Sequence, residues 1–300
     1  MIMKYPVILM SITTLLLTGC DIFEEPEPVD EYFIEAYLIA NKPADGILVS
    51  EISSFEEEYR FEDNVVNNAE ISIFKLNDDS TRAERYEFQN QSDGKYTPSD
   101  SLVPEPLRTY ELEVIIPDDD TLHAFTTVPD TFSINSSPDE PLEYTRERQL
   151  SVDFSGSYYP GRESLYLFST ESLKPDSYKM TPEHFTADEK QQKEAIVTRS
   201  QFFSENMLNP DDDQGYTVDY PLASTRYYGP NEITLYAVDD GFYEFYQSQE
   251  IQLGDGGLSP GQIRNVDHNI INGKGLFGSL AGSSFEMYLS QPDDYTPSED

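Results

Sequence analysis

The sequence feature that most constrains the fold is an apolar period of two, which recurs between residues 32 and 129. In segment 110–116, apolar residues alternate with Glu111 and Glu113, and the cluster at 77–80 is typical of a turn. Successive side chains of a strand point to opposite faces of a sheet, so this pattern indicates half-buried strands. Because no segment of helix length lies between these strands, we expect an antiparallel β-sandwich over residues 32–130.

The second half of the chain is also predicted to be rich in β-structure. Segment 129–141 concentrates Pro, Ser, Asp and Asn, which marks a domain boundary. We therefore expect a β-rich C-terminal domain over 142–290. Its strands are expected at 149–154, 164–170, 232–238 and 285–289.

Two short helices are predicted within this C-terminal domain. Phe242, Phe245 and Tyr246 fall at helical spacing, which predicts an amphipathic helix over 242–252. A proline after Thr181 is typical of a helix start, which predicts a charged helix over 182–193.

The N-terminal residues have the organisation of an export signal. A short basic start is followed by an apolar run over 5–17, which is too short to span a bilayer as a helix. This combination is typical of a secretory signal peptide, here residues 1–19. Two small residues separate this run from the chain's only cysteine, which has no partner for an intramolecular disulfide. This end resembles the lipobox of bacterial lipoproteins, which implies a covalent lipid on the cysteine. The residues concerned are Leu17, Thr18, Gly19 and Cys20.

Two acidic segments flank the predicted domains. Residues 20–31 hold six carboxylates and two prolines, which predicts an extended tether, and residues 291–300 form an acidic tail. The formal charge of the whole chain is −38. This charge argues against nucleic acid or an anionic membrane surface as a partner. It is compatible with solubility alone, with divalent cations or with a basic partner.

The search for a catalytic site is negative, and we expect no enzymatic activity. The three histidines are His123, His184 and His268, and none has a second histidine three or four residues away, so no His-Glu-x-x-His zinc site exists. The sequence contains no Gly-x-Ser-x-Gly elbow, and Cys20 is expected to be acylated. His268 is kept as a candidate contact residue because it lies beside a glycine-rich run.

Only weak metal signals are present, and no cofactor is expected other than the lipid. Asp211 and Asp213 begin a run that faintly resembles a calcium loop, but the twelfth position is Leu222 instead of a bidentate acid. A solvated turn explains the same residues.

Paired aromatic residues are candidate contact residues for a ligand or a partner. Neighbours in a strand point to opposite faces, so one ring of each pair is expected to be exposed. Exposed tyrosines are suited to sugars and to protein interfaces, although packing under loops is the alternative. The pairs concerned are Tyr158 with Tyr159 and Tyr227 with Tyr228.

A glycine-rich signature occupies residues 269–278. Closely spaced glycines require unusual backbone angles or close approach, which predicts a tight structural turn that packs Phe277 into the core. Ligand contact is the alternative, although Lys274 is the one cation in the run and the spacing matches no phosphate loop. The signature residues are Asn269, Asn272, Gly273, Gly275, Phe277 and Gly278.

This run resembles the signature of a Bacteroidetes outer-membrane lipoprotein family, catalogued as domain of unknown function 4249. The resemblance implies a lipid-anchored protein of the outer membrane and cell surface, with an immunoglobulin-like N-terminal part. It also implies association with a TonB-dependent β-barrel transporter, and it supplies no catalytic residues. We therefore expect a binding accessory in nutrient capture. The alternative is a structural or adhesive envelope protein with a calcium-responsive acidic surface.

Overall fold

The computed structural model of the chain describes residues 31–52, 63–117, 121–136, 138, 140–185, 196–210, 215–253 and 266–292. The lipobox with Cys20, the candidate calcium ligands Asp211 and Asp213, and most of both acidic segments lie outside the described residues. Within them, no helix combines the length and apolarity that a bilayer crossing requires.

The first half of the chain forms seven strands, as the period of two predicts. Strand β1 buries every second side chain, and its neighbours pair in the order β1-β2-β5-β4-β3-β6-β7 through antiparallel ladders. The strands are β1 (Tyr32–Ile39), β2 (Ile47–Glu51), β3 (Glu70–Leu76), β4 (Arg82–Asn90), β5 (Lys95–Pro98), β6 (Thr109–Ile115) and β7 (Leu122–Thr127).

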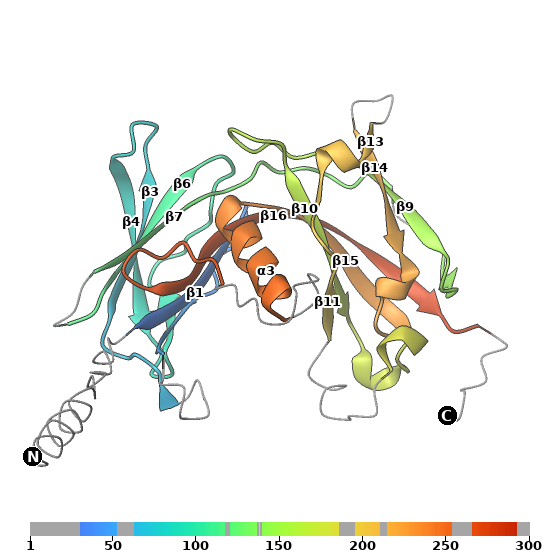
Figure 1. The fold of residues 1–300 in the computed structure, drawn as a ribbon, viewed down its shortest axis with the longest axis horizontal. Coiled ribbons are helices and arrows are strands. Elements are labelled where there is room, and N and C mark those ends of the chain that lie inside the picture. The colour runs from blue at the N-terminus through green and yellow to red at the C-terminus, as the bar shows by residue number, and fades with distance from the viewer. Residues whose placement is uncertain are drawn as a thin grey trace, which may run out of the picture.

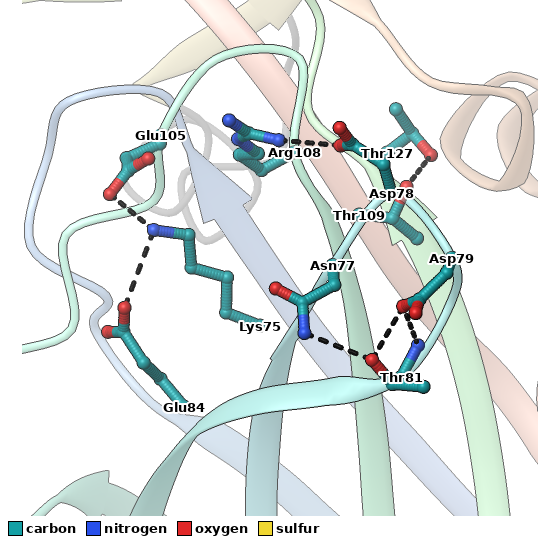
Figure 2. A network of polar contacts seen from close by, with 10 residues as sticks. All are labelled: Lys75, Asn77, Asp78, Asp79, Thr81, Glu84, Glu105, Arg108, Thr109 and Thr127. Atoms are coloured by element: carbon teal, nitrogen blue, oxygen red, sulfur yellow. Dashed lines mark hydrogen bonds and ion pairs between the residues drawn. The ribbon is translucent and has the colours of Figure 1, made fainter.

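The predicted turn at 77–80 joins β3 to β4 and is held by local polar contacts (Figure 2). Ser80 has a positive φ of 64°, and Asp79 accepts hydrogen bonds from the backbone and hydroxyl of Thr81. Beside the turn, Lys75 Nζ lies 2.6 Å from Glu105 and 3.6 Å from Glu84. These contacts fix the hairpin, and its carboxylates have partners within the network.

The second half is mainly β as well, with one α-helix among the described residues. Helix α3 (Asp240–Leu253) confirms the helix predicted at 242–252. The helix predicted at 182–193 is wrong at its start, where only the single 3₁₀ turn Pro182–His184 forms; residues 186–195 lie outside the described residues. The strands are β8 (Leu142–Glu143), β9 (Gln149–Phe154), β10 (Leu165–Ser172), β11 (Val197–Arg199), β12 (Phe203–Ser204), β13 (Asn209–Pro210), β14 (Tyr216–Pro221), β15 (Gly229–Val238) and β16 (Lys274–Ser290), with further 3₁₀ turns at Pro175–Ser177, Glu205–Met207 and Leu222–Ser224.

Strand β16 connects the two halves. Residues 280–289 of this 17-residue strand pair antiparallel with β15, and residues 274–280 pair parallel with β1. The ladders among β1–β7 are antiparallel, as expected for residues 32–130. Strand β16 adds parallel ladders to β1 and to β8, because it reaches them from the far end of the chain and not through a hairpin. The predicted closing strand at 285–289 is also much longer than expected and includes the second half of the glycine-rich run, residues 274–278.

Within the described residues, the result is a mixed sheet of 13 strands together with a separate three-stranded sheet, β13-β14-β9 (Figure 1). The first core lies within the N-terminal strands, and the second lies between the two sheets. We call β1–β7 with their core the N-terminal lobe, and β8–β15 with their core the C-terminal lobe. In the N-terminal lobe, β7 returns to the start of β16 through a backbone bridge between His123 and Ile271. The predicted mainly-β class is confirmed, whereas the immunoglobulin-like arrangement stays a prediction. A third apolar cluster lies under α3, where the lobes meet.

Candidate functional site: a groove beneath helix α3

In the part of the chain that the structure describes, a groove of about 190 Å³ lies between α3 and the sheet. Five strands, β11, β10, β15, β16 and β1, supply its floor, and α3 supplies its wall. Its lining is aromatic and aliphatic with one charged side chain. The lining residues are Tyr37, Ile39, Leu167, Ser169, Arg199, Tyr236, Phe242, Tyr246 and Leu280.

The strand register explains why these side chains share one face. Residues directly opposite on neighbouring strands point to the same side of a sheet. Ser169 lies opposite Arg199, and Leu167 lies opposite Tyr236. Arg199 is therefore held beside Ser169 by the β10–β11 ladder, over the same face as the apolar floor.

Helix α3 closes the other side with residues one turn apart. Phe242 and Tyr246 are four positions apart, so they lie on one face of the helix, and their ring centroids are 4.5 Å apart. The guanidinium of Arg199 lies 4.9 Å from the centre of the Tyr246 ring. This cation–π contact places the positive charge against an aromatic wall of the groove.

A chain of hydroxyl groups ties the two sides of the groove together. The Tyr37 hydroxyl donates to Glu35 over 2.7 Å. Since a hydroxyl has one proton, the 2.9 Å contact between Tyr37 and Tyr246 must have Tyr246 as its donor. Burial raises the pKa of Tyr37 far above its ordinary value, with further contributions from Tyr246 and Glu35, so it stays neutral.

Two glycines of β16 allow the groove to form. A Cβ at Gly278 would lie 3.2 Å from Phe242 Cβ, and a Cβ at Gly282 would lie 2.7 Å from Tyr236 Cε1. These positions let α3 and the Tyr236 ring approach the sheet.

The remaining signature residues have structural roles. Asn269 donates to the carbonyl of Phe277 over 2.7 Å and accepts from its amide over 2.9 Å. Phe277 is fully buried, which confirms its predicted core packing. Asn272 has a φ of 64° in the turn that precedes β16, but Gly275 and Gly278 lie in the strand itself and not in the predicted turn.

Asp239 directly precedes the first residue of α3 and is only 2% exposed. Its Oδ1 accepts the amide of Phe242 over 2.9 Å, as an N-cap residue does. Its Oδ2 accepts the Thr126 hydroxyl of β7 over 2.6 Å, so one carboxyl joins α3 to the N-terminal lobe. Burial raises the pKa of Asp239 to about 6.

The predicted contact residues lie apart from this groove's lining. Tyr158 is 59% exposed, whereas Tyr159 is buried beneath Arg162. The expectation of one exposed ring is wrong for Tyr227 and Tyr228, which are 6% and 3% exposed, because the chain there leads into β15 and Tyr228 packs edge-on against the ring of Tyr144. His268 is exposed, and its Nε2 lies 3.3 Å from Lys274 Nζ.

The structure also brings together a polar cluster that sequence spacing did not reveal. Glu111, Glu113 and His123 meet across β6 and β7, where one potential ligand atom of each lies within 4.8 Å of the others. Arg82 binds Glu111 over 2.7 Å and Glu113 over 2.5 Å, while its guanidinium lies 3.8 Å from the Phe74 ring centre. An arginine therefore supplies the positive charge here, and it holds the pKa of Glu111 below its ordinary value.

The groove itself had one signal in the sequence. The helical spacing of Phe242 and Tyr246 was visible, but nothing marked Tyr37, Tyr236 or Arg199. Their convergence depends on the pairing of strands far apart in the chain, which residue spacing does not reveal.

Comparisons with known proteins place the chain by sequence. No curated protein matches it. Among solved structures, trypsin-activated α-2-macroglobulin from Escherichia coli is 11% identical over 71% of this chain and 15% of that chain, with a TM-score of 0.22. Salmonella α-2-macroglobulin reacted with methylamine is 10% identical over 88% and 15%, with a TM-score of 0.24. These scores do not indicate a shared fold. A family model does match, over residues 21–286, and the chain belongs to the family described as Domain of unknown function (DUF4249).

Proposed function

We propose that this chain is a lipid-anchored binding protein of the bacterial outer membrane and works beside a TonB-dependent β-barrel transporter. The observation that carries the binding role is the groove beneath α3, which joins an aromatic lining to the one charged side chain of Arg199. Ligand sites commonly combine an apolar lining with a few placed polar groups. The groove lacks the nucleophile–base pairs of catalytic sites, which favours capture over chemistry.

The proposed anchor rests on the N-terminal sequence. The family match begins at residue 21, directly after Cys20, as expected if the mature chain starts at an acylated cysteine. More than one acyl chain makes attachment stable, because each buried methylene contributes about 0.8 kcal/mol. A tethered protein has a raised effective concentration beside any partner in the same membrane.

The test is crosslinking in the native membrane, followed by affinity purification and identification of the bound proteins. We expect a β-barrel transporter to be captured with the wild-type chain. The variant Cys20→Ala should leave the membrane fraction and lose the crosslink, because it has no thiol to acylate.

A matched control separates anchoring from folding. Arg85→Gln removes an exposed charge on β4, far from the anchor in the sequence, and should leave membrane retention and capture unchanged. Recovery of the wild-type chain without any transporter, under conditions that crosslink a known membrane complex, would contradict the transporter association. Membrane retention of Cys20→Ala would contradict the anchor.

A further inference from the structure

The groove beneath α3 has the dimensions of a site for one ring. An engineered protein cavity of about 150 Å³ holds a benzene molecule, and this groove measures about 190 Å³. The extra space corresponds to a small substituent. A second ring or a sugar chain would extend beyond the lined volume.

The walls of the groove favour a flat aromatic body. Tyr236, Phe242 and Tyr246 supply rings from two elements that face each other across the cleft. Aromatic pairs are stabilised in edge-to-face or offset geometry beyond the burial of area alone. Ile39, Leu167 and Leu280 add aliphatic side chains to the floor.

The polar groups of the groove favour an anion at one end of that ring. The hydroxyl protons of Tyr246 and Tyr37 are directed along the chain that ends at Glu35, so they are not offered to a ligand. Arg199 presents a guanidinium, which donates to carboxylates in a bidentate fork, and Ser169 lies opposite it on the next strand. Arg199 and Ser169 therefore place donors at the β10–β11 side, and the hydroxyl of Tyr236 on the neighbouring β15 is a further polar group of the groove.

We infer that this groove binds a small single-ring aromatic carboxylate, with the ring between α3 and the sheet and the carboxylate on Arg199. This inference rests on the proposed binding role and names the ligand class of the same site. It does not depend on the identity of the transporter.

The probe is benzoate, titrated into the mature protein and followed by calorimetry and saturation-transfer NMR. Benzamide has the same ring and size without the charge, and is the matched neutral probe. We expect benzoate to bind about tenfold more tightly than benzamide, because a charge-assisted pair to Arg199 is stronger than a neutral hydrogen bond.

Three variants locate the site. Arg199→Gln should weaken benzoate about tenfold and leave benzamide unchanged, since only the charged pair is lost. Arg85→Gln removes a positive charge outside the groove and should change the affinity for neither benzoate nor benzamide. Ser169→Phe places a ring in the groove and should abolish both, with far-UV circular dichroism used to verify the fold.

Equal affinities for benzoate and benzamide, an unchanged benzoate affinity in Arg199→Gln, or no binding of either probe up to about 10 mM would each overturn the inference. Because Arg199 is an exposed side chain, its variant is informative even where Ser169→Phe fails to fold. If benzoate does not bind, the result of the transporter crosslinking is unaffected. If no transporter is crosslinked, the result of the benzoate titration is unaffected, so each experiment tests its own proposal.

Discussion

The cores of the two lobes are filled by different kinds of side chains. The N-terminal core consists mainly of Ile, Val, Leu and Ala from regular strands. The C-terminal core is dominated by rings in edge-to-face contact, such as Phe154 with Tyr166 and Phe168 with Tyr220, each pair at 5.2 Å. The C-terminal lobe also includes strands of two or three residues and several 3₁₀ turns beside the long strands β10 and β15. Large rings therefore fill the core of the lobe with the less uniform strands, and smaller aliphatic side chains fill the core of the lobe built from successive hairpins.

The strongest test of this comparison is the joint between the lobes at Gly275. This residue has a φ of +103°, and a Cβ there would lie 2.0 Å from the carbonyl oxygen of Ile34 on β1. Gly275→Ala should destabilise the protein by more than about 4 kcal/mol, because backbone strain and a backbone clash combine. Urea unfolding followed by circular dichroism measures the change.

Gly161→Ala is the matched control for that joint. Gly161 also has a positive φ, +86°, but no atom lies within 4 Å of its added Cβ. The Gly161→Ala variant should lose only about 1 kcal/mol of its free energy of unfolding, because it has the backbone strain without the steric clash. Similar losses in the two variants would mean that the close approach of β1 and β16 is unimportant.

Truncating core side chains tests whether the two lobes, whose cores contain different side chains, unfold together. Phe154→Ala in the C-terminal core should cost about 4 kcal/mol, and Leu112→Ala in the N-terminal core about 3 kcal/mol. Because β16 contributes to both cores, each variant should shift one shared transition. Near-ultraviolet circular dichroism reports the packing of the aromatic rings, and the far-ultraviolet signal reports the whole sheet. Separated transitions from these two probes would show that the lobes are independent.

The same comparison explains what the sequence could predict. Strands such as β1 and β6 could be predicted because apolar and polar residues alternate along a half-buried strand. The aromatic helix was readable from the spacing of Phe242 and Tyr246. Strand β16 was underestimated because its glycines are usually depleted in strands, and here they serve close packing.

The groove and the polar cluster were beyond sequence reasoning for a different reason. Arg199 comes from a three-residue strand without periodicity, and Tyr37 reaches the groove only because β1 pairs with a strand more than 230 positions later in the chain. The binding of Arg82 to Glu111 likewise joins β4 to β6 across the intervening β3. Such contacts follow from sheet order, which a list of strands does not specify.

Within the N-terminal lobe, Arg82→Gln tests the polar outer face. Glu111 is 8% exposed and would lose its main cationic partner, so we expect a loss of about 1 to 2 kcal/mol at pH 7. Arg82 holds the pKa of Glu111 below its ordinary value, so the stabilisation is present above that value and is lost as the pH falls through the folded-state pKa. The gap between variant and wild type should therefore narrow below about pH 4.

Chemical denaturation at several pH values measures this gap. Arg108→Gln, at an exposed pair with Asp78, is the matched control and should change stability by less than about 0.5 kcal/mol. Equal losses for the two arginines would show that the cluster is an ordinary surface pair.

Between the lobes, Asp239→Asn tests the buried carboxyl. The pKa of Asp239 is raised to about 6 in the folded state, so its favourable contribution is complete below the unfolded-state pKa and is lost as the pH rises through about 6. From pH 5 to pH 7.5 the wild type should lose about 1 kcal/mol relative to the variant. Parallel urea titrations at the two pH values measure this difference, and a constant difference would mean that Asp239 titrates normally.

The smallest expected effect concerns the hydroxyl chain that links β1 to α3. Tyr37→Phe removes the bond to Glu35 and the acceptor of Tyr246, so it should cost about 1 kcal/mol. Tyr246→Phe removes one donor and leaves the Tyr37–Glu35 bond in place, so about half that loss is expected. The two variants delete the same atom type from the same contact, and each is the control for the other. A larger loss for Tyr246→Phe than for Tyr37→Phe would contradict the assigned chain, in which Tyr37 takes part in both hydrogen bonds.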